Sequence, residues 1–360
     1  MPLWASLIYF IQKFLMLQVY HGMLWLRRMV YNRLIIPLSN REIFMSQLLT
    51  TMFNVIAPIL LIASLGAFLG RVIAIDRRTL SSVLIYLFMP ALVLEGITNA
   101  RVGNDQLIRM MLFVFIGCTI LALIGWLIAK VLRLDFMTTN AFVLCVMMIN
   151  AANYGIPFNK FAFGQSAEQL AVVYYVASAV VSNTLGVYFA SRGNSASARG
   201  AMLNIFKVPL LYATIIGLIF NQLGIFITAP TDMPNAPALP LPLARMIDIL
   251  SDAAVPTMLV LLGVLLAQSR FTAKRIMPML VAGGVKLLIA PIIAILLMSL
   301  LGIDGLARQV GIIQLSMPVA VLASALAAQF DADTEFVTGV IFISTLGSIL
   351  TLSVLVILVG

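Results

Sequence analysis

The sequence has few charged side chains. Only 10% of its 360 residues are Asp, Glu, Lys or Arg, whereas a soluble globular domain carries about a quarter. Hydrophobic residues make up 62% of the chain, and the mean hydropathy is +1.10. Runs of about 20 apolar residues recur along most of the length, which is what a helix needs to span a bilayer. The composition therefore excludes a soluble protein and predicts an all-α polytopic membrane protein.

Cysteine and histidine are almost absent. Cys118 and Cys145 both fall in apolar segments, where cysteine behaves as a small core residue and neither a disulfide nor a metal pair is indicated. His21 is the single histidine, which excludes most histidine-based metal sites and proton relays. Because no phosphate-binding motif is visible either, we expect no metal, no cofactor and no direct use of ATP.

The net charge of +9 lies mostly in segments between the apolar runs. In a membrane protein, such charge sets orientation and attracts anionic headgroups, so the partner that it indicates is the lipid bilayer and not nucleic acid. More Lys and Arg residues lie in the connections after odd-numbered spans than after even-numbered ones. This bias predicts that the connections after even-numbered spans face outward.

The first fifty residues differ from the rest. Residues 1–26 are apolar but are interrupted by polar and charged side chains, and four arginines follow by residue 41. This N-terminal extension (1–50) is interpreted either as one imperfect span or as interfacial amphipathic helices. A further interpretation is that translation starts at Met45 or Met52.

From residue 52 onward the pattern predicts ten spans joined by short connections. A polar hinge loop at residues 191–202 separates a first set of five spans (51–190) from a second set (203–360). The expected spans are 52–70, 79–99, 108–130, 138–164, 168–190, 205–227, 243–267, 275–301, 307–329 and 335–358.

The two halves carry matching landmarks, which recur after 161 to 167 residues: Pro90 and Pro256, Pro157 and Pro318, Phe163 and Phe330, Glu168 and Glu335. The nearly constant offset indicates a weak internal repeat. Because each copy holds an odd number of spans, the second must insert upside down. Two inverted five-helix repeats with paired broken helices are typical of secondary transporters.

Four residues interrupt the fourth span: Asn150, Asn153, Gly155 and Pro157. Proline removes a backbone donor and clashes with the preceding turn. In hydrocarbon, the freed backbone groups must find partners in protein or in a water-filled cavity. A broken helix with amide side chains at mid-depth therefore predicts a substrate site. The alternative is a structural kink whose asparagines satisfy the freed carbonyls.

Pro318 marks the corresponding break in the ninth span, and Gln314 and Ser316 just before it are candidates for polar contacts with the substrate. The amides that open a half-helix after each break carry partial positive charge. Together with asparagine donors, which need no charge in hydrocarbon, these helix ends favour a carboxylate ligand.

Four ionisable residues fall within or near the spans. Lys286, in the eighth span, is interpreted as attracting the anion or anchoring the broken helices, with snorkelling or pairing to a carboxylate as the alternative. Glu95, Asp248 and Asp252 are candidates for coupling to H⁺ or Na⁺. The alternatives are a capped helix end for Glu95 and an interfacial helix start for the aspartates, which share one face at i, i+4 spacing.

The segment Asn150-Ala-Ala-Asn-Tyr-Gly-Ile-Pro157 resembles the broken-helix motif of the auxin efflux carrier family. This family comprises plant auxin exporters and bacterial organic-acid carriers. Residues 317–320 resemble its second broken helix, and residues 340–346 resemble its last helix. The resemblance covers residues 52–358 and matches the short bacterial type.

The resemblance implies that the fourth and ninth spans cross at their breaks and hold the substrate there. It also implies a scaffold and a transport domain that move past each other, a homodimer, and a location in the cell membrane, most naturally the bacterial inner membrane.

The sequence thus predicts a secondary carrier of small organic anions, driven by the membrane potential or coupled to H⁺ or Na⁺. A non-transporting receptor or sensor with the same fold is the alternative. An intramembrane aspartyl enzyme is not expected, because Asp248 and Asp252 lie on one helix.

Overall fold

The computed structural model describes residues 41–73, 75–100, 103–191, 209–229, 233–267, 275–329 and 332–360, and its regular elements there are helices. They are α2 (Arg41–Thr51), η3 (Met52–Ile56), α3 (Ala57–Val72), α4 (Arg77–Val83), η4 (Leu84–Phe88), α5 (Met89–Asn99), α6 (Asn104–Val131), α7 (Phe136–Met147), η5 (Ala151–Gly155), α8 (Ile156–Phe163), α9 (Gln165–Val181), η6 (Ser182–Gly186), α10 (Val187–Ser191), α12 (Pro209–Leu223), α13 (Leu241–Ala267), α14 (Ile276–Gly284), η9 (Val285–Ile289), α15 (Ala290–Leu301), α16 (Gly305–Leu315), α17 (Leu322–Gln329) and α18 (Thr334–Val359), where η denotes a π-helix.

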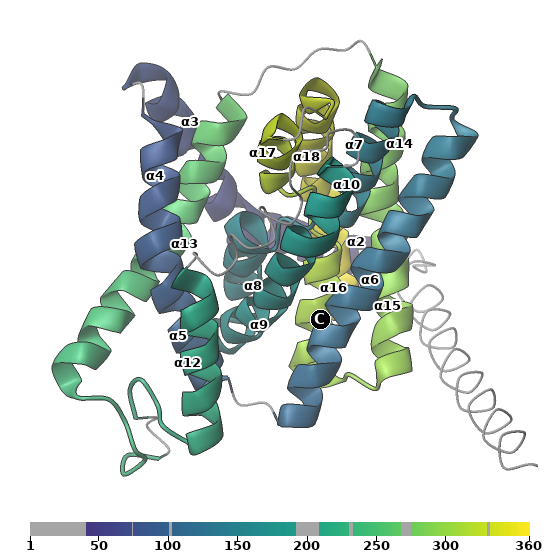
Figure 1. The fold of residues 1–360 in the computed structure, drawn as a ribbon. Helices are drawn as coiled ribbons and strands as arrows, with labels where there is room; N and C mark the ends of the chain where they lie inside the picture. Colours follow the sequence, from purple (N-terminus) through teal and green to yellow (C-terminus); the bar gives the residue numbers. More distant parts are fainter. Residues whose placement is uncertain are drawn as a thin grey trace, which may run out of the picture.

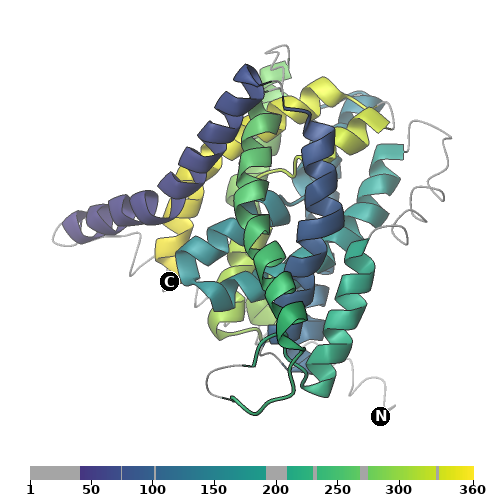
Figure 2. The same cartoon turned by 90° about the vertical axis from the view of Figure 1, so that its left-hand side faces the viewer.

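The helices follow the expected apolar runs. Within the described residues, seven continuous helices are long and apolar enough to cross a membrane, and two shorter apolar helices span Phe136–Met147 and Pro209–Leu223. The first of the seven joins the end of α2 to η3 and α3, and Figure 2 shows α2 turned away from the axis of α3. The polar hinge (191–202), apart from Ser191, and most of the N-terminal extension lie outside the described residues.

The helices form two packed groups (Figure 1). In the first bundle, α13 packs along α3 and α5, and α12 packs along α5. In the second bundle, α6 contacts α7 and α9, α16 contacts α9 and α15, and α14 contacts α18. The bundles meet where α5 lies against α9 and where α13 lies against η5.

Glycine allows α3 and α13 to approach closely. A Cβ at Gly263 would lie 1.8 Å from the Ala63 carbonyl oxygen, and one at Gly66 would lie 2.2 Å from that of Val260. The backbones are therefore in direct contact, as is common where small residues line membrane helices. A Cβ at Gly70, one turn beyond Gly66, would lie 3.4 Å from the nearest atoms of Val264, which is only just in contact.

The N-termini of α7 and α18 are tied together at one end of the second bundle. Asp135 and Asp333 cap these helices, and Arg275 lies 2.7 Å from Asp333 Oδ2 and 3.5 Å from Asp135 Oδ2. The backbone N–H of Thr138 lowers the pKa of Asp135 below its ordinary value, and the Thr138 hydroxyl and Arg275 act in the same direction. Polar contacts thus hold the start of α14 against both helices.

Replacing Gly263 by alanine is expected to lower the stability of the protein. The new methyl group would push α13 away from α3, and such overpacking costs about 1–3 kcal/mol. Thermal unfolding in detergent measures the effect. Gly284→Ala is the matched control, because no atom lies within 4 Å of a Cβ at this helical position. Equal melting temperatures for the two variants would contradict the close approach.

Candidate functional site

The fourth and ninth predicted spans are both interrupted, and their breaks meet. Residues 148–150 separate α7 from η5, and residues 316–321 separate α16 from α17. Ile149 and Val319 form an antiparallel bridge, and the Asn150 N–H donates to the Pro318 carbonyl oxygen at 3.0 Å. The two extended segments therefore satisfy part of each other's backbone, as expected if these helices cross at their breaks.

The first break is not where the sequence predicted it. Pro157 lies in the first turn of α8, and the helix continues through it from η5. The interruption comes seven residues earlier, after Met148 adopts an extended conformation with ψ 135°. Pro318, in contrast, does lie within the second break. The prediction was wrong for Pro157 because the backbone pairing with the ninth span, and not proline, ends α7.

Proline has a different effect in this fold. Four prolines, Pro58, Pro90, Pro157 and Pro291, each stand at the second position after a five-residue π-helix. A proline leaves the carbonyl four residues before it without its usual donor, and a local π-helical turn is one way to accommodate that loss. Pro157 thus widens the helix that follows the break.

Asparagine side chains lie beside the first break. Asn150 is only 3% exposed, and its Nδ2 has no hydrogen-bond partner within the described part of the chain. Its carbonyl oxygen accepts a hydrogen bond from the Gly155 N–H at 2.9 Å. Asn153 is half-buried in η5. An amide donor that is buried without an acceptor costs free energy, which makes Asn150 the most direct candidate for a ligand contact.

Gln314, near the end of α16, links this helix to η5 and to α9. Its Nε2 donates to the carbonyl oxygens of Ala171 at 3.2 Å and Ala151 at 3.4 Å, while its Oε1 is buried without a partner. A Cβ at Gly155 would lie 2.3 Å from this Oε1, so Gly155 leaves the space that Gln314 fills. The Ser316 hydroxyl donates to the Ile312 carbonyl oxygen at 2.6 Å and is thereby satisfied within its own helix.

Lys286 lies beside the second break. It is fully buried in η9, and its Nζ donates to the Leu315 carbonyl oxygen, at the C-terminal end of α16, at 3.3 Å. No ion pair joins it to a carboxylate within the described residues. A buried ammonium without a counterion is expensive in hydrocarbon.

Two serines on α18 support the broken helices and were not predicted. The Val319 N–H donates to Ser344 Oγ at 3.2 Å, and Ser348 Oγ lies 3.5 Å from the Tyr154 hydroxyl oxygen. One helix face therefore holds both the second break and the π-helix after the first. The sequence signal was the i, i+4 spacing of hydroxyls within an otherwise apolar run.

The three predicted coupling residues line one cavity between the two bundles. Its volume is about 840 Å³, and its lining includes four carboxylates but no Lys or Arg. The lining also reaches Leu170, next to Ala171, whose carbonyl oxygen binds Gln314. The cavity therefore reaches the part of α9 that contacts Gln314. Its lining residues include Glu95, Asn99, Gln106, Gln165, Gln169, Thr228, Asp248, Asp252 and Asp304.

Comparison with known proteins identifies the class of the molecule. A family model described as "Membrane transport protein" matches residues 51–199 and 194–356. The chain belongs to this family. The resemblance to the auxin efflux carrier family is thus confirmed, and the molecule is a multi-pass membrane transporter and not an enzyme.

Two archaeal relatives of the transporter are similar over most of their length. An uncharacterized transporter of Methanothermobacter thermautotrophicus is 28% identical over 278 residues, which cover 77% of this chain and 87% of the relative. An uncharacterized transporter of Methanocaldococcus jannaschii is 22% identical over 303 residues, which cover 82% and 95% respectively.

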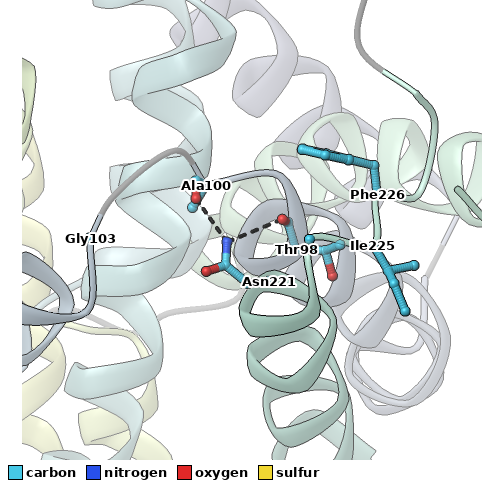
Figure 3. A pocket seen from close by; sticks show the side chains of 7 residues that line it. Thr98, Ala100, Gly103, Asn221, Ile225 and Phe226 are labelled. Carbon is cyan, nitrogen blue, oxygen red and sulfur yellow. Dashed lines mark hydrogen bonds between the residues drawn. The ribbon is translucent and has the colours of Figure 1, made fainter. Parts of the chain in front are cut away.

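A second cavity of the transporter, about 290 Å³ in volume, shares Ala100 and Phe226 with the acidic one. Figure 3 shows the residues that line this second cavity. Asn221, on α12, donates from Nδ2 to the carbonyl oxygens of Thr98 at 3.2 Å and Ala100 at 2.8 Å. These carbonyls lie at the C-terminal end of α5, where no helical partner remains. Asn221 therefore caps α5 beside the acidic cavity.

Replacing Ser344 by alanine is expected to loosen the second break of the transporter. It leaves the buried Val319 N–H without an acceptor, which costs about 1–3 kcal/mol. Thermal unfolding together with hydrogen exchange of residues 316–322 measures the loss. Ser353→Ala is the matched control on the same helix, because the Ser353 hydroxyl only donates to Ile349 of its own helix. Unchanged exchange in Ser344→Ala would show that this contact is not needed.

Proposed function

We propose that this transporter is a secondary carrier of small organic anions, most simply carboxylates, and that it binds them where α7–α8 and α16–α17 cross. The main support for this proposal is that two side chains at the crossing lack a full set of hydrogen-bond acceptors. Asn150 Nδ2 has no partner within the described residues, and the Lys286 ammonium has a single described acceptor, the Leu315 carbonyl oxygen. A carboxylate supplies acceptors and the missing negative charge at the same time.

The N-terminal ends of the helices that follow the two breaks also favour an anionic substrate. η5 continues into α8 directly after Asn150, and α17 starts just past Pro318. The N-terminal amides of a helix carry partial positive charge, which stabilises a nearby anion by about 0.3–1 kcal/mol at exposed sites and up to about 2 kcal/mol when partly buried. In carriers built from broken helices, such ends point at anionic substrate groups.

We assign the first bundle (α3–α5, α12 and α13) to the scaffold and the second bundle to the transport domain of an alternating-access cycle. The ten spans would form two inverted repeats of five, because the paired prolines and the paired breaks recur in both halves. The acidic cavity lies between the bundles and would give access to the crossing from the outer face. Glu95, Asp248 and Asp252 are then the candidates for binding a coupling H⁺ or Na⁺.

A homodimer and a bacterial inner-membrane location belong to the proposal as well. The dimer rests on the family resemblance. The location follows from the resemblance to the short bacterial type, and an archaeal cell membrane is equally consistent, because the two relatives named above are archaeal.

Asn150→Ala is expected to reduce carboxylate flux about tenfold or more, because a hydrogen bond to a charged group contributes about 1.5–3 kcal/mol. Flux is measured in proteoliposomes with radiolabelled acetate, lactate, succinate and malate. Asn153→Ala and Pro157→Ala test the neighbouring positions. Asn183→Ala is the matched control, because its Nδ2 donates to Ala179 within the same continuous helix, far along the chain from the break.

Normal flux in Asn150→Ala and in the Asn153→Ala, Pro157→Ala double variant would refute the crossing as the substrate site. A thermal-shift screen of the same carboxylates adds a readout that does not depend on flux, since a bound ligand raises the melting temperature. Binding without flux would favour the receptor alternative.

A further inference from the structure

The C-terminal end of α16 has an unusual partner. α16 ends at Leu315, where the chain enters the second break, and the carbonyl groups at a helix end have no partner within the helix. The Leu315 carbonyl oxygen accepts its one described hydrogen bond from Lys286 Nζ. A cation is therefore fixed at the negative end of a half-helix, beside the crossing.

The Lys286 side chain lies in the protein interior and not at the surface. Lys286 has no exposed surface, and it stands in η9, the π-helix that precedes Pro291. The π-helical turn changes the direction in which successive side chains leave the helix. Among the described residues no carboxylate pairs with it, and the one acceptor described for it is the Leu315 carbonyl oxygen.

Freed carbonyls and half-helix C-terminal ends are the groups that coordinate Na⁺ in carriers with broken helices. At this crossing, the carbonyl group at the end of α16, that of Leu315, already accepts a hydrogen bond from the ammonium group of Lys286. We propose that Lys286 replaces a coupling Na⁺ at the crossing, bridging the end of α16 and the anionic substrate. The carrier then moves its substrate without Na⁺. This inference rests on the proposed function and settles one of its open choices, the coupling ion at the crossing.

The first test uses the wild-type protein. Proteoliposomes are loaded with the four radiolabelled carboxylates, K⁺ and valinomycin hold the membrane potential, and pH is equal on both sides. Replacing Na⁺ by N-methyl-D-glucamine is expected to leave flux and the melting temperature unchanged. Flux that needs Na⁺, or a melting temperature that Na⁺ raises above the N-methyl-D-glucamine value, would overturn the proposal.

The second test removes the charge. Lys286→Met keeps the length and apolar stem of the side chain, and it is expected to lower flux about tenfold or more, as for other losses of a charge-assisted hydrogen bond. Its melting temperature is expected to rise when Na⁺ or methylammonium is added, because either cation can return to the end of α16. Lys286→Arg retains the charge and is expected to show no such cation response.

Lys130→Met is the control for general salt effects, because Lys130 lies over the Trp126 ring in the last turn of α6. A Lys286→Met variant that responds to cations no more than this control would contradict the proposal. If Lys286→Met cannot be purified, the comparison of wild-type flux in Na⁺ and in N-methyl-D-glucamine still tests the proposal. If the proposed function is wrong, the result is different. No carboxylate flux is then measured with any cation, while added cations still raise the melting temperature of Lys286→Met in detergent.

Discussion

The short antiparallel contact between the two broken helices is the constraint on which the rest of the site depends. Within hydrocarbon there is no water to accept or donate hydrogen bonds, so an interrupted helix survives only if protein groups satisfy its freed backbone. Here each break supplies what the other lacks, through the bridge between Ile149 and Val319 and the bond from Asn150 to Pro318.

The surrounding polar side chains serve the same requirement. Ser344 accepts from the Val319 N–H, Lys286 donates to the Leu315 carbonyl oxygen, and Gln314 donates to the Ala151 carbonyl oxygen. Each satisfies a backbone group at or beside a break. One buried side-chain donor beside the first break, Asn150 Nδ2, has no partner among the described residues.

The acidic cavity adds a second electrostatic element. Four carboxylates line the path between the bundles, whereas the crossing itself holds a buried ammonium. The two regions therefore differ in charge: carboxylates line the cavity, and a lysine side chain lies at the crossing. Close approach of α3 and α13 through Gly263 and Gly66 keeps the first bundle compact, so that the cavity lies at the boundary between bundles and not within one of them.

Composition and hydrophobic periodicity alone determined the class of the protein, the positions of the membrane helices to within a few residues, and the two spans that are interrupted. These features follow from local chemistry, because an apolar run must be helical in lipid and a polar motif inside it must be accommodated. Only the tertiary structure decided that the fourth span is interrupted at residues 148–150 and not at Pro157, that Ser344 contacts the second break, and that Lys286 binds a helix end. Each of these depends on a partner more than 20 residues away in the chain, and hydrogen bonds between distant segments leave no periodic trace in the sequence.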